Sequence, residues 1–219
     1  MKSITRKAKK MKLQLALDDI QFDDAIELAK KVSGSVDIFE MGTPFIIENG
    51  MRSVRTFSKL FPNNEILADT KIMDAGAYEA ALTYIAGADD CTVMGITDDQ
   101  TIKECVKTAQ KYGKRLFVDT ICISNPTERI PKLEALGVRN ISVHVGVDQQ
   151  SLGESPLSSL KKIKAASKKS CLSVAGGIKL DTVNQYRVLE PDIVIVGGGI
   201  LHADDPAQAA QKLAAVVHS

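Results

Sequence analysis

The sequence lacks paired cysteines, long hydrophobic runs and a strong excess of charge, and each absence excludes a class of protein. Its cysteines, Cys91, Cys105, Cys122 and Cys171, include no CxxC pair, so neither a zinc cluster nor a small disulfide framework is indicated, and a reducing cytoplasm is expected. The first apolar run, residues 13–17, is too short for a signal sequence and ends at two aspartates. With 44% hydrophobic and 25% charged residues, the composition excludes a disordered or membrane-embedded chain.

Charge is nearly balanced, with 28 basic and 27 acidic residues among 219. Six of the basic residues precede the first acid, Asp18, which leaves a mildly acidic body without the broad basic surface that nucleic acid requires. We therefore expect a basic N-terminal extension at residues 1–10 and one catalytic domain at residues 11–219, because no linker rich in proline or serine divides the chain.

Short apolar runs alternate with amphipathic stretches along the chain. Eight apolar runs predict strands, at residues 13–17, 36–40, 65–71, 91–94, 116–119, 141–144, 171–175 and 193–196. Eight segments of helical period predict helices, at residues 23–32, 51–61, 77–86, 101–112, 127–136, 156–167, 180–189 and 205–217. Strict alternation predicts a parallel sheet covered by helices, and units of about 27 residues favour an α/β fold of the single-domain (β/α)8 (TIM) barrel type. A doubly wound open sheet is the second interpretation.

Charged residues stand at the carboxyl ends of several predicted strands, where barrels of this type carry their active sites. Asp69 and Lys71 are two residues apart on one strand, so both side chains are expected to face the barrel interior. With Asp18 and Glu40 they form an acidic cluster around one ammonium group. That composition suits a divalent cation with oxygen ligands and a lysine that stabilises developing negative charge. A structural salt bridge is the alternative.

The last three predicted strands end in residues suited to proton transfer and phosphate binding. His144 ends the sixth strand and is a candidate for proton transfer. The seventh and eighth strands end in glycines whose bare backbone suits a phosphate group: Gly176, Gly177, Gly197 and Gly198. Their spacing is not the GxGxxG of a dinucleotide site. Only three histidines are present, which weakens the hypothesis of a zinc- or iron-dependent pentose-phosphate epimerase.

Several motifs resemble those of the orotidine 5′-monophosphate decarboxylase suprafamily. DTKIMD at residues 69–74 matches its DxKxxD motif, and DIFEMGTP at residues 37–44 resembles the second-strand motif of its metal-dependent members. Within that group, VHVGVDQQ at residues 143–150 and the glycine sequences after the last two strands look most like the 3-hexulose-6-phosphate synthases. The sibling 3-keto-L-gulonate-6-phosphate decarboxylases carry an arginine where Val147 stands, so the resemblance favours the synthase branch.

The resemblance implies a lyase that depends on Mg²⁺, with Mn²⁺ as a substitute. It assigns the metal to Glu40 and Asp69, stabilisation of an enediolate to Lys71, and movement of a proton to His144. Asp18 would orient Lys71 or the substrate hydroxyls. The substrates implied are D-ribulose 5-phosphate and formaldehyde, joined in a reversible aldol addition, and the glycine sequences would hold the sugar phosphate.

The resemblance also implies a homodimer with shared active sites, because Asp74 resembles a family residue contributed across the dimer interface. A helix-capping role for Asp74 is the alternative. Asp119, at the end of the fifth predicted strand, is expected to be structural or to support the other residues. Two further functions stay open: a metal-dependent 3-keto-L-gulonate-6-phosphate decarboxylase with the same enediolate chemistry, and a non-catalytic barrel that binds a sugar phosphate. No nucleic-acid or membrane partner is expected.

Overall fold

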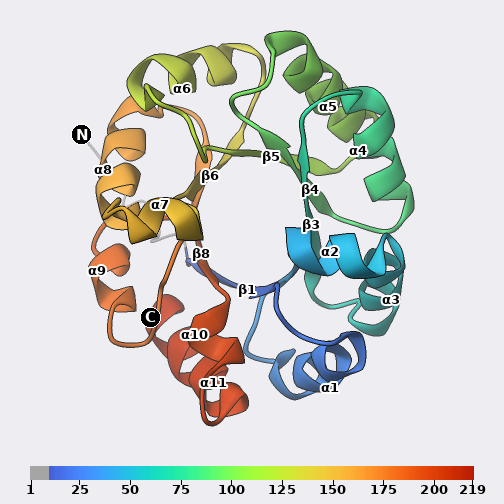
Figure 1. Ribbon diagram of the computed structural model, residues 1–219, viewed down its shortest axis with the longest axis vertical. Coiled ribbons are helices and arrows are strands. Elements are labelled where there is room, and N and C mark those ends of the chain that lie inside the picture. Colours follow the sequence, from blue (N-terminus) through green and yellow to red (C-terminus); the bar gives the residue numbers. More distant parts are fainter. Residues whose placement is uncertain (1–9) are drawn as a thin grey trace, which may run out of the picture.

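The computed structural model describes residues 10–219 and places a closed barrel of parallel strands inside a ring of helices (Figure 1). The strands are β1 (Lys12–Leu17), β2 (Ile38–Met41), β3 (Glu65–Ile72), β4 (Asp90–Met94), β5 (Arg115–Asp119), β6 (Asn140–His144), β7 (Cys171–Ala175) and β8 (Ile193–Val196). Each strand pairs with the next, and β1 also pairs with β8, so the sheet has no open edge. The predicted (β/α)8 barrel is confirmed and the open doubly wound sheet is wrong.

Helices follow the strands around the barrel. They are α1 (Phe22–Val32), α2 (Thr43–Asn49), α3 (Arg52–Leu60), α4 (Gly76–Ile85), α5 (Asp99–Tyr112), α6 (Pro126–Ala135), α7 (Val147–Ser151), α8 (Pro156–Ala166), α9 (Val183–Arg187), α10 (Gly198–Leu201) and α11 (Pro206–Val217). The short α2, α7 and α10 were not predicted, because four to seven residues are too few to show a helical hydrophobic period. The helix α9 is shorter than predicted, since the Thr182 hydroxyl accepts from the Lys179 N–H in a turn that precedes it.

Alternation along each strand divides the apolar residues into two layers. On β1, Leu13, Leu15 and Leu17 belong to the large core between strands and helices. Inside the barrel a second, smaller apolar cluster contains Ala16, Ile38, Leu67, Phe117, Ile193 and Ile195. The polar site described below therefore lies above an apolar floor.

The amino-terminal end of the barrel carries charges that are paired with one another. Arg115 donates two hydrogen bonds of 2.6 Å to the buried carboxylate of Asp90 and a third, of 2.5 Å, to Glu65. The ammonium group of Lys12 also contacts Glu65. These groups satisfy one another, so this end has the character of a structural closure.

The barrel runs from β1 to α11 and takes up nearly all of the described residues. The predicted basic extension, residues 1–10, lies outside the described residues except for Lys10. Within the described part of the chain the cysteines form no disulfide, and no helix there is long and apolar enough to cross a bilayer.

Glu134 on α6 holds the connection between α8 and β7. Its carboxylate accepts hydrogen bonds from the Lys168, Lys169 and Ser170 backbone N–H groups at 2.8–3.1 Å, and from the Ser167 and Ser170 hydroxyls at 2.9 Å. Burial raises the pKa of Glu134, but these hydrogen bonds outweigh burial and lower it. The ionised carboxylate thus stabilises the fold.

Replacing Glu134 by glutamine is expected to lower the free energy of unfolding by about 2 kcal/mol at pH 7, because an acceptor-only charged group is lost from several buried donors. A folded-state pKa below the unfolded value means that this stabilisation is present above the unfolded pKa and is lost as the pH falls. Urea denaturation at pH 7 and at pH 3 measures both effects. Glu128→Gln, at an exposed position of the same helix, is the control; equal stability of the two variants at pH 7 would contradict the assignment.

Candidate active site

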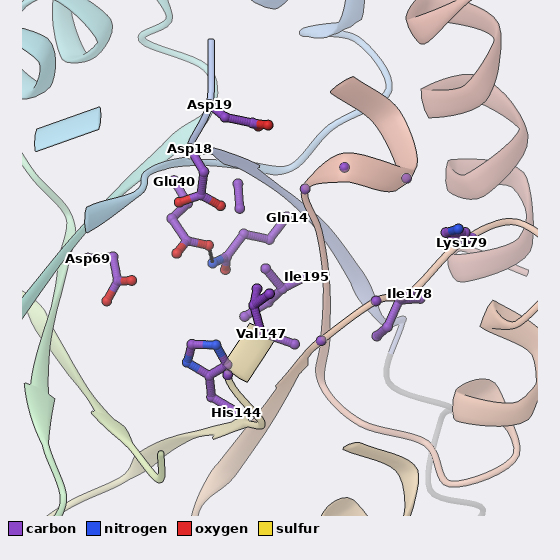
Figure 2. A pocket seen from close by; sticks show the side chains of 18 of the residues that line it. Gln14, Asp18, Asp19, Glu40, Asp69, His144, Val147, Ile178, Lys179 and Ile195 are labelled. Carbon is purple, nitrogen blue, oxygen red and sulfur yellow. Dashed lines mark hydrogen bonds between the residues drawn. The ribbon is translucent and has the colours of Figure 1, made fainter. Parts of the chain in front are cut away.

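The carboxyl-terminal end of the barrel opens into a cavity of about 1510 Å³. Almost all of the predicted site residues line it: Asp18, Glu40, Asp69, Lys71, His144, Gly176, Gly177, Gly197 and Gly198. Figure 2 shows the carboxylates of Asp18, Glu40 and Asp69 on one side and the ring of His144 on the other. Residues spread over some 180 positions of the sequence thus meet at one end of the barrel, as parallel strand order requires.

Asp74 is the exception among the predicted residues. It is exposed in the connection after β3, it does not line the cavity, and its carboxylate accepts a 2.7 Å hydrogen bond from the Ala75 N–H. Ala75, in the left-handed conformation with φ 49°, stands at the N-cap of α4, so Asp74 is not the helix cap. A single chain leaves the Asp74 carboxylate facing outward.

The strand that carries Asp69 and Lys71 is less regular than predicted. Its register against β4 shifts between Ala68 and Ile72, and Lys71 adopts φ 46°, in the left-handed region. The Lys71 N–H donates to the Thr92 hydroxyl at 2.9 Å instead of continuing the strand ladder. Both charged side chains still line the cavity, but they do so through a local distortion that costs about 1–2 kcal/mol for a non-glycine residue.

Asp119 connects the lysine to the histidine. Its Oδ2 atom lies 3.3 Å from Lys71 Nζ and 2.9 Å from His144 Nδ1, and its side chain is only 3% exposed. The Lys71 ammonium group also contacts the Asp69 carboxylate. Because a carboxylate only accepts hydrogen bonds, His144 presents Nδ1–H to Asp119, which leaves Nε2 as the ring atom available for proton transfer.

The pKa values of this network follow from its contacts. Burial alone would lower the pKa of Lys71, but the negative charges of Asp69 and Asp119 more than offset it and raise that pKa, so the amine stays protonated. Burial would raise the pKa of Asp119, whereas the hydrogen bond from His144 and the charge of Lys71 lower it. The site therefore holds a fixed ammonium group beside a fixed carboxylate.

Two threonines hold Asp69 in place. The Thr92 hydroxyl donates to Oδ1 at 2.6 Å, and the Thr43 hydroxyl, on α2, donates to Oδ2 at 3.0 Å. With Lys71, these contacts fix the plane of the Asp69 carboxylate in the cavity wall.

Glu40 and Asp18 add negative charge close to Asp69. Glu40 is 8% exposed, and burial together with the nearby charges of Asp69 and Asp18 raises its pKa to about 8. Burial and the charge of Asp69 also raise the pKa of Asp18. The contacts to Lys71 come from Asp69 and Asp119, so of the two roles expected for Asp18, the one facing the substrate hydroxyls fits its position.

These carboxylates fit a magnesium ion. Across residues 10–219 no three Asp, Glu, His or Cys side chains form a ready cage for a metal. Mg²⁺ does not require one, because it is commonly held by one or two carboxylates and completes its shell with water and substrate oxygens. Glu40 and Asp69, hard oxygen donors crowded into a region of raised carboxyl pKa, meet that requirement.

The glycine sequences after β7 and β8 form the opposite wall. Gly176 has φ 122°, and a Cβ atom there would lie 2.6 Å from Pro156 Cγ. A Cβ atom on Gly199 would lie 2.5 Å from the Ile178 carbonyl oxygen, so the two connections pack backbone against backbone. Side chains are excluded there, and the cavity is lined by main chain on that side.

Sequence reasoning did not find Thr43, Thr92 or Gln14 and left the role of Asp119 undefined. The threonines follow from tertiary contacts that no local pattern shows. Gln14 did carry a signal: it is a polar residue at an inward-facing position of an otherwise apolar run.

Known proteins with similar sequences belong to the same group as the motifs suggested. Residues 11–213 match the family described as "Orotidine 5'-phosphate decarboxylase / HUMPS family". The chain belongs to this family. A relative in Staphylococcus epidermidis, named 3-hexulose-6-phosphate synthase, is 44% identical over 207 residues, which cover 94% of this chain and 99% of that protein.

Solved structures of the family agree in fold. The 3-hexulose-6-phosphate synthase of Salmonella typhimurium has a TM-score of 0.93 and 43% identity, covering 94% of this chain and 98% of its own. A structure of KGPDC from Streptococcus mutans in complex with a sugar phosphate has a TM-score of 0.86 and 28% identity, covering 94% and 97%. The family is catalytic and these relatives are lyases, so the prediction of a lyase of this family is confirmed.

Proposed function

We propose that this protein catalyses the reversible aldol addition of formaldehyde to D-ribulose 5-phosphate, which gives 3-hexulose 6-phosphate. The observation that carries the proposal is the Lys71–Asp119–His144 network, which lies beside the carboxylates of Glu40 and Asp69 in one cavity. An acid–base group and a fixed positive charge are what enolisation of a ketose requires. The relatives named 3-hexulose-6-phosphate synthase support the choice of reaction.

The residues divide the work as follows. Bound Mg²⁺ would supply a Lewis acid for the ketose oxygens, and Glu40 and Asp69 are the side chains that would hold it. His144 Nε2 removes a proton from C1 of the sugar phosphate, while Asp119 holds the ring and stabilises the charge that it gains. Lys71 stabilises the negative charge that develops on the sugar oxygens.

Carbon–carbon bond formation then follows from the enediolate. Its C1 attacks the formaldehyde carbon, the carbonyl π bond breaks, and the resulting oxygen accepts a proton from the protonated His144. The reverse sequence cleaves the hexulose. Gly176, Gly177, Gly197 and Gly198 would place the phosphate against bare main chain on the far wall.

Val147 favours the synthase over a decarboxylase. It lines the cavity at the start of α7 and is 82% exposed, so the mouth of the site presents an apolar side chain there. A sugar acid carries a carboxylate that a cation at this position would bind, whereas formaldehyde is neutral. The structural likeness to KGPDC makes 3-keto-L-gulonate 6-phosphate the comparison substrate.

The test is an assay of ribulose 5-phosphate consumption with and without formaldehyde, run beside 3-keto-L-gulonate 6-phosphate. We expect formaldehyde-dependent consumption that is lost after exhaustive chelation and restored by Mg²⁺ or Mn²⁺. Full turnover in a metal-free preparation would contradict the role of Glu40 and Asp69. Release of CO₂ from the sugar acid alone would identify a decarboxylase, and no reaction of either substrate would indicate a barrel that only binds.

We further propose that the protein is a homodimer whose active sites are completed by Asp74 of the partner. Asp74 lies beside an exposed apolar face formed by Met73, Tyr78, Leu82 and Ile85, which are 50%, 67%, 44% and 67% exposed. The last three are spaced by four and three residues on α4 and share one side of that helix. A second copy would cover this face by two-fold symmetry and bring Asp74 toward the other cavity.

Mixing two inactive variants tests the shared site. Asp74→Asn and Lys71→Ala chains, each inactive alone, are expected to regain about a quarter of wild-type activity when mixed one to one, because half of the dimers are mixed and each mixed dimer has one intact site. Exchange of subunits is verified by mass spectrometry. Absence of rescue despite verified exchange would show that both residues serve the same chain.

A further inference from the structure

Gln14 on β1 is a polar residue inside the barrel. Its neighbours Leu13 and Leu15 face the helices, whereas Gln14 lines the active-site cavity and is only 1% exposed. Its partners in the adjoining strands, Ile38 on β2 and Ile195 on β8, are apolar. Gln14 thus lies one layer below Glu40, which pairs with the next inward residue of β1, Ala16.

An amide in this layer destabilises the fold unless its polar atoms are bonded, and an apolar side chain of similar size would fit the floor better. Ile38, Leu67 and Ile195 show that the rest of this layer is built from such side chains. The glutamine therefore calls for an explanation in the site above it.

The amide contacts Glu40 with one of its two ends. Nε2 donates to Glu40 Oε2 at 2.6 Å, and Figure 2 shows the side chain directed at that carboxylate with Ile195 beside it. Since an ionised carboxylate can only accept, the N–H end must face Glu40 and the carbonyl must face elsewhere. This hydrogen bond fixes one Glu40 oxygen from below and leaves the other toward the cavity.

The carbonyl end of the amide has no partner. Throughout residues 10–219, Gln14 Oε1 is the one buried side-chain nitrogen or oxygen without a hydrogen bond. The flanking Ile38 and Ile195 side chains offer no donor. An acceptor buried at the floor of a cavity is satisfied by an O–H donor within that cavity, either a water molecule or a sugar hydroxyl.

We infer that Gln14 is a positioning residue of the active site, which orients Glu40 toward the cation and accepts a hydrogen bond from an O–H group of the bound complex. The inference rests on the proposed function, because it takes Glu40 as a metal ligand. Groups that orient a ligating carboxylate typically change metal affinity by about 10–100-fold when they are removed.

The test compares Mn²⁺ binding, measured by electron paramagnetic resonance titration, in the wild type, Gln14→Met and the control Ile38→Val. Methionine keeps the length of the side chain and removes both hydrogen-bonding ends. We expect Gln14→Met to weaken Mn²⁺ binding by about 10-fold or more, with an unchanged or higher Tm, and Ile38→Val to bind as the wild type does. Gln14→Leu serves as a second variant if the methionine protein does not fold.

Repeating the titration with ribulose 5-phosphate identifies the source of the O–H donor. Weaker Mn²⁺ binding already without the sugar supports the inference with water as the donor, and weaker binding only with the sugar supports it with a sugar hydroxyl. Wild-type affinity of the Gln14 variants in both titrations would overturn the inference and leave the proposed function intact. A wild-type protein that binds no Mn²⁺ in either titration would overturn the proposed function, and with it this role of Gln14.

Discussion

Replacing Lys71 by alanine is expected to lower kcat by a factor on the order of 10²–10³ and to change the KM for ribulose 5-phosphate far less. The ammonium group is held by Asp69 and Asp119 at the point where negative charge develops on the sugar. A group matched to that charge acts mainly in the transition state, so its loss reduces turnover more than ground-state binding.

Steady-state kinetics with ribulose 5-phosphate and formaldehyde measure the effect. The control is Lys103→Ala, at an exposed position on α5, for which kinetics like those of the wild type are expected. The Tm of both variants is compared with that of the wild type, because Lys71 has a left-handed backbone. A collapse of substrate affinity with a normal kcat would make Lys71 a ground-state binding group and contradict its assigned role.

Replacing Asp119 by asparagine is expected to lower kcat by a factor on the order of 10²–10⁴, a range that reflects what loss of a carboxylate behind a catalytic histidine costs elsewhere. The buried Asp119 accepts from His144 Nδ1 and lies 3.3 Å from Lys71 Nζ. Asparagine is nearly the same size but carries no charge, so it no longer stabilises the charged ring of His144 or the ammonium of Lys71.

The pH profile separates this positioning role from a structural one. Asp119→Asn should change the pH dependence of kcat, because it removes the charge next to the histidine that transfers the proton. Asp24→Asn, on the exposed side of α1, is the control and should keep the wild-type profile. An Asp119→Asn protein with an unaltered profile and near-normal kcat would show that Asp119 only fills space at the end of β5.

The barrel was predictable because its signal is repeated. Each of the eight strands is an apolar run followed by a helical period, and the residue that ends a strand is placed at the same rim by parallel topology alone. Glu40, Asp69 and His144 could therefore be assigned to one site from order along the chain.

What the sequence could not provide is the pairing within that site. Regular alternation predicts that Lys71 faces inward, but the register shift and left-handed backbone that place it against Asp119 depend on a hydrogen bond to Thr92 from the next strand. The link from Asp119 to His144 joins side chains 25 residues apart. Such contacts depend on rotamers and on local distortion, which no periodicity encodes.

The most direct test of the account is to observe the new carbon–carbon bond. The enzyme, Mg²⁺, [1-¹³C]ribulose 5-phosphate and [¹³C]formaldehyde are combined and followed by ¹³C nuclear magnetic resonance. The account predicts a pair of signals that share a one-bond carbon–carbon coupling, that appear only with active enzyme, and that are absent with the Lys71→Ala protein. Unchanged signals of both labelled substrates, under conditions in which the same preparation releases CO₂ from 3-keto-L-gulonate 6-phosphate, would contradict it.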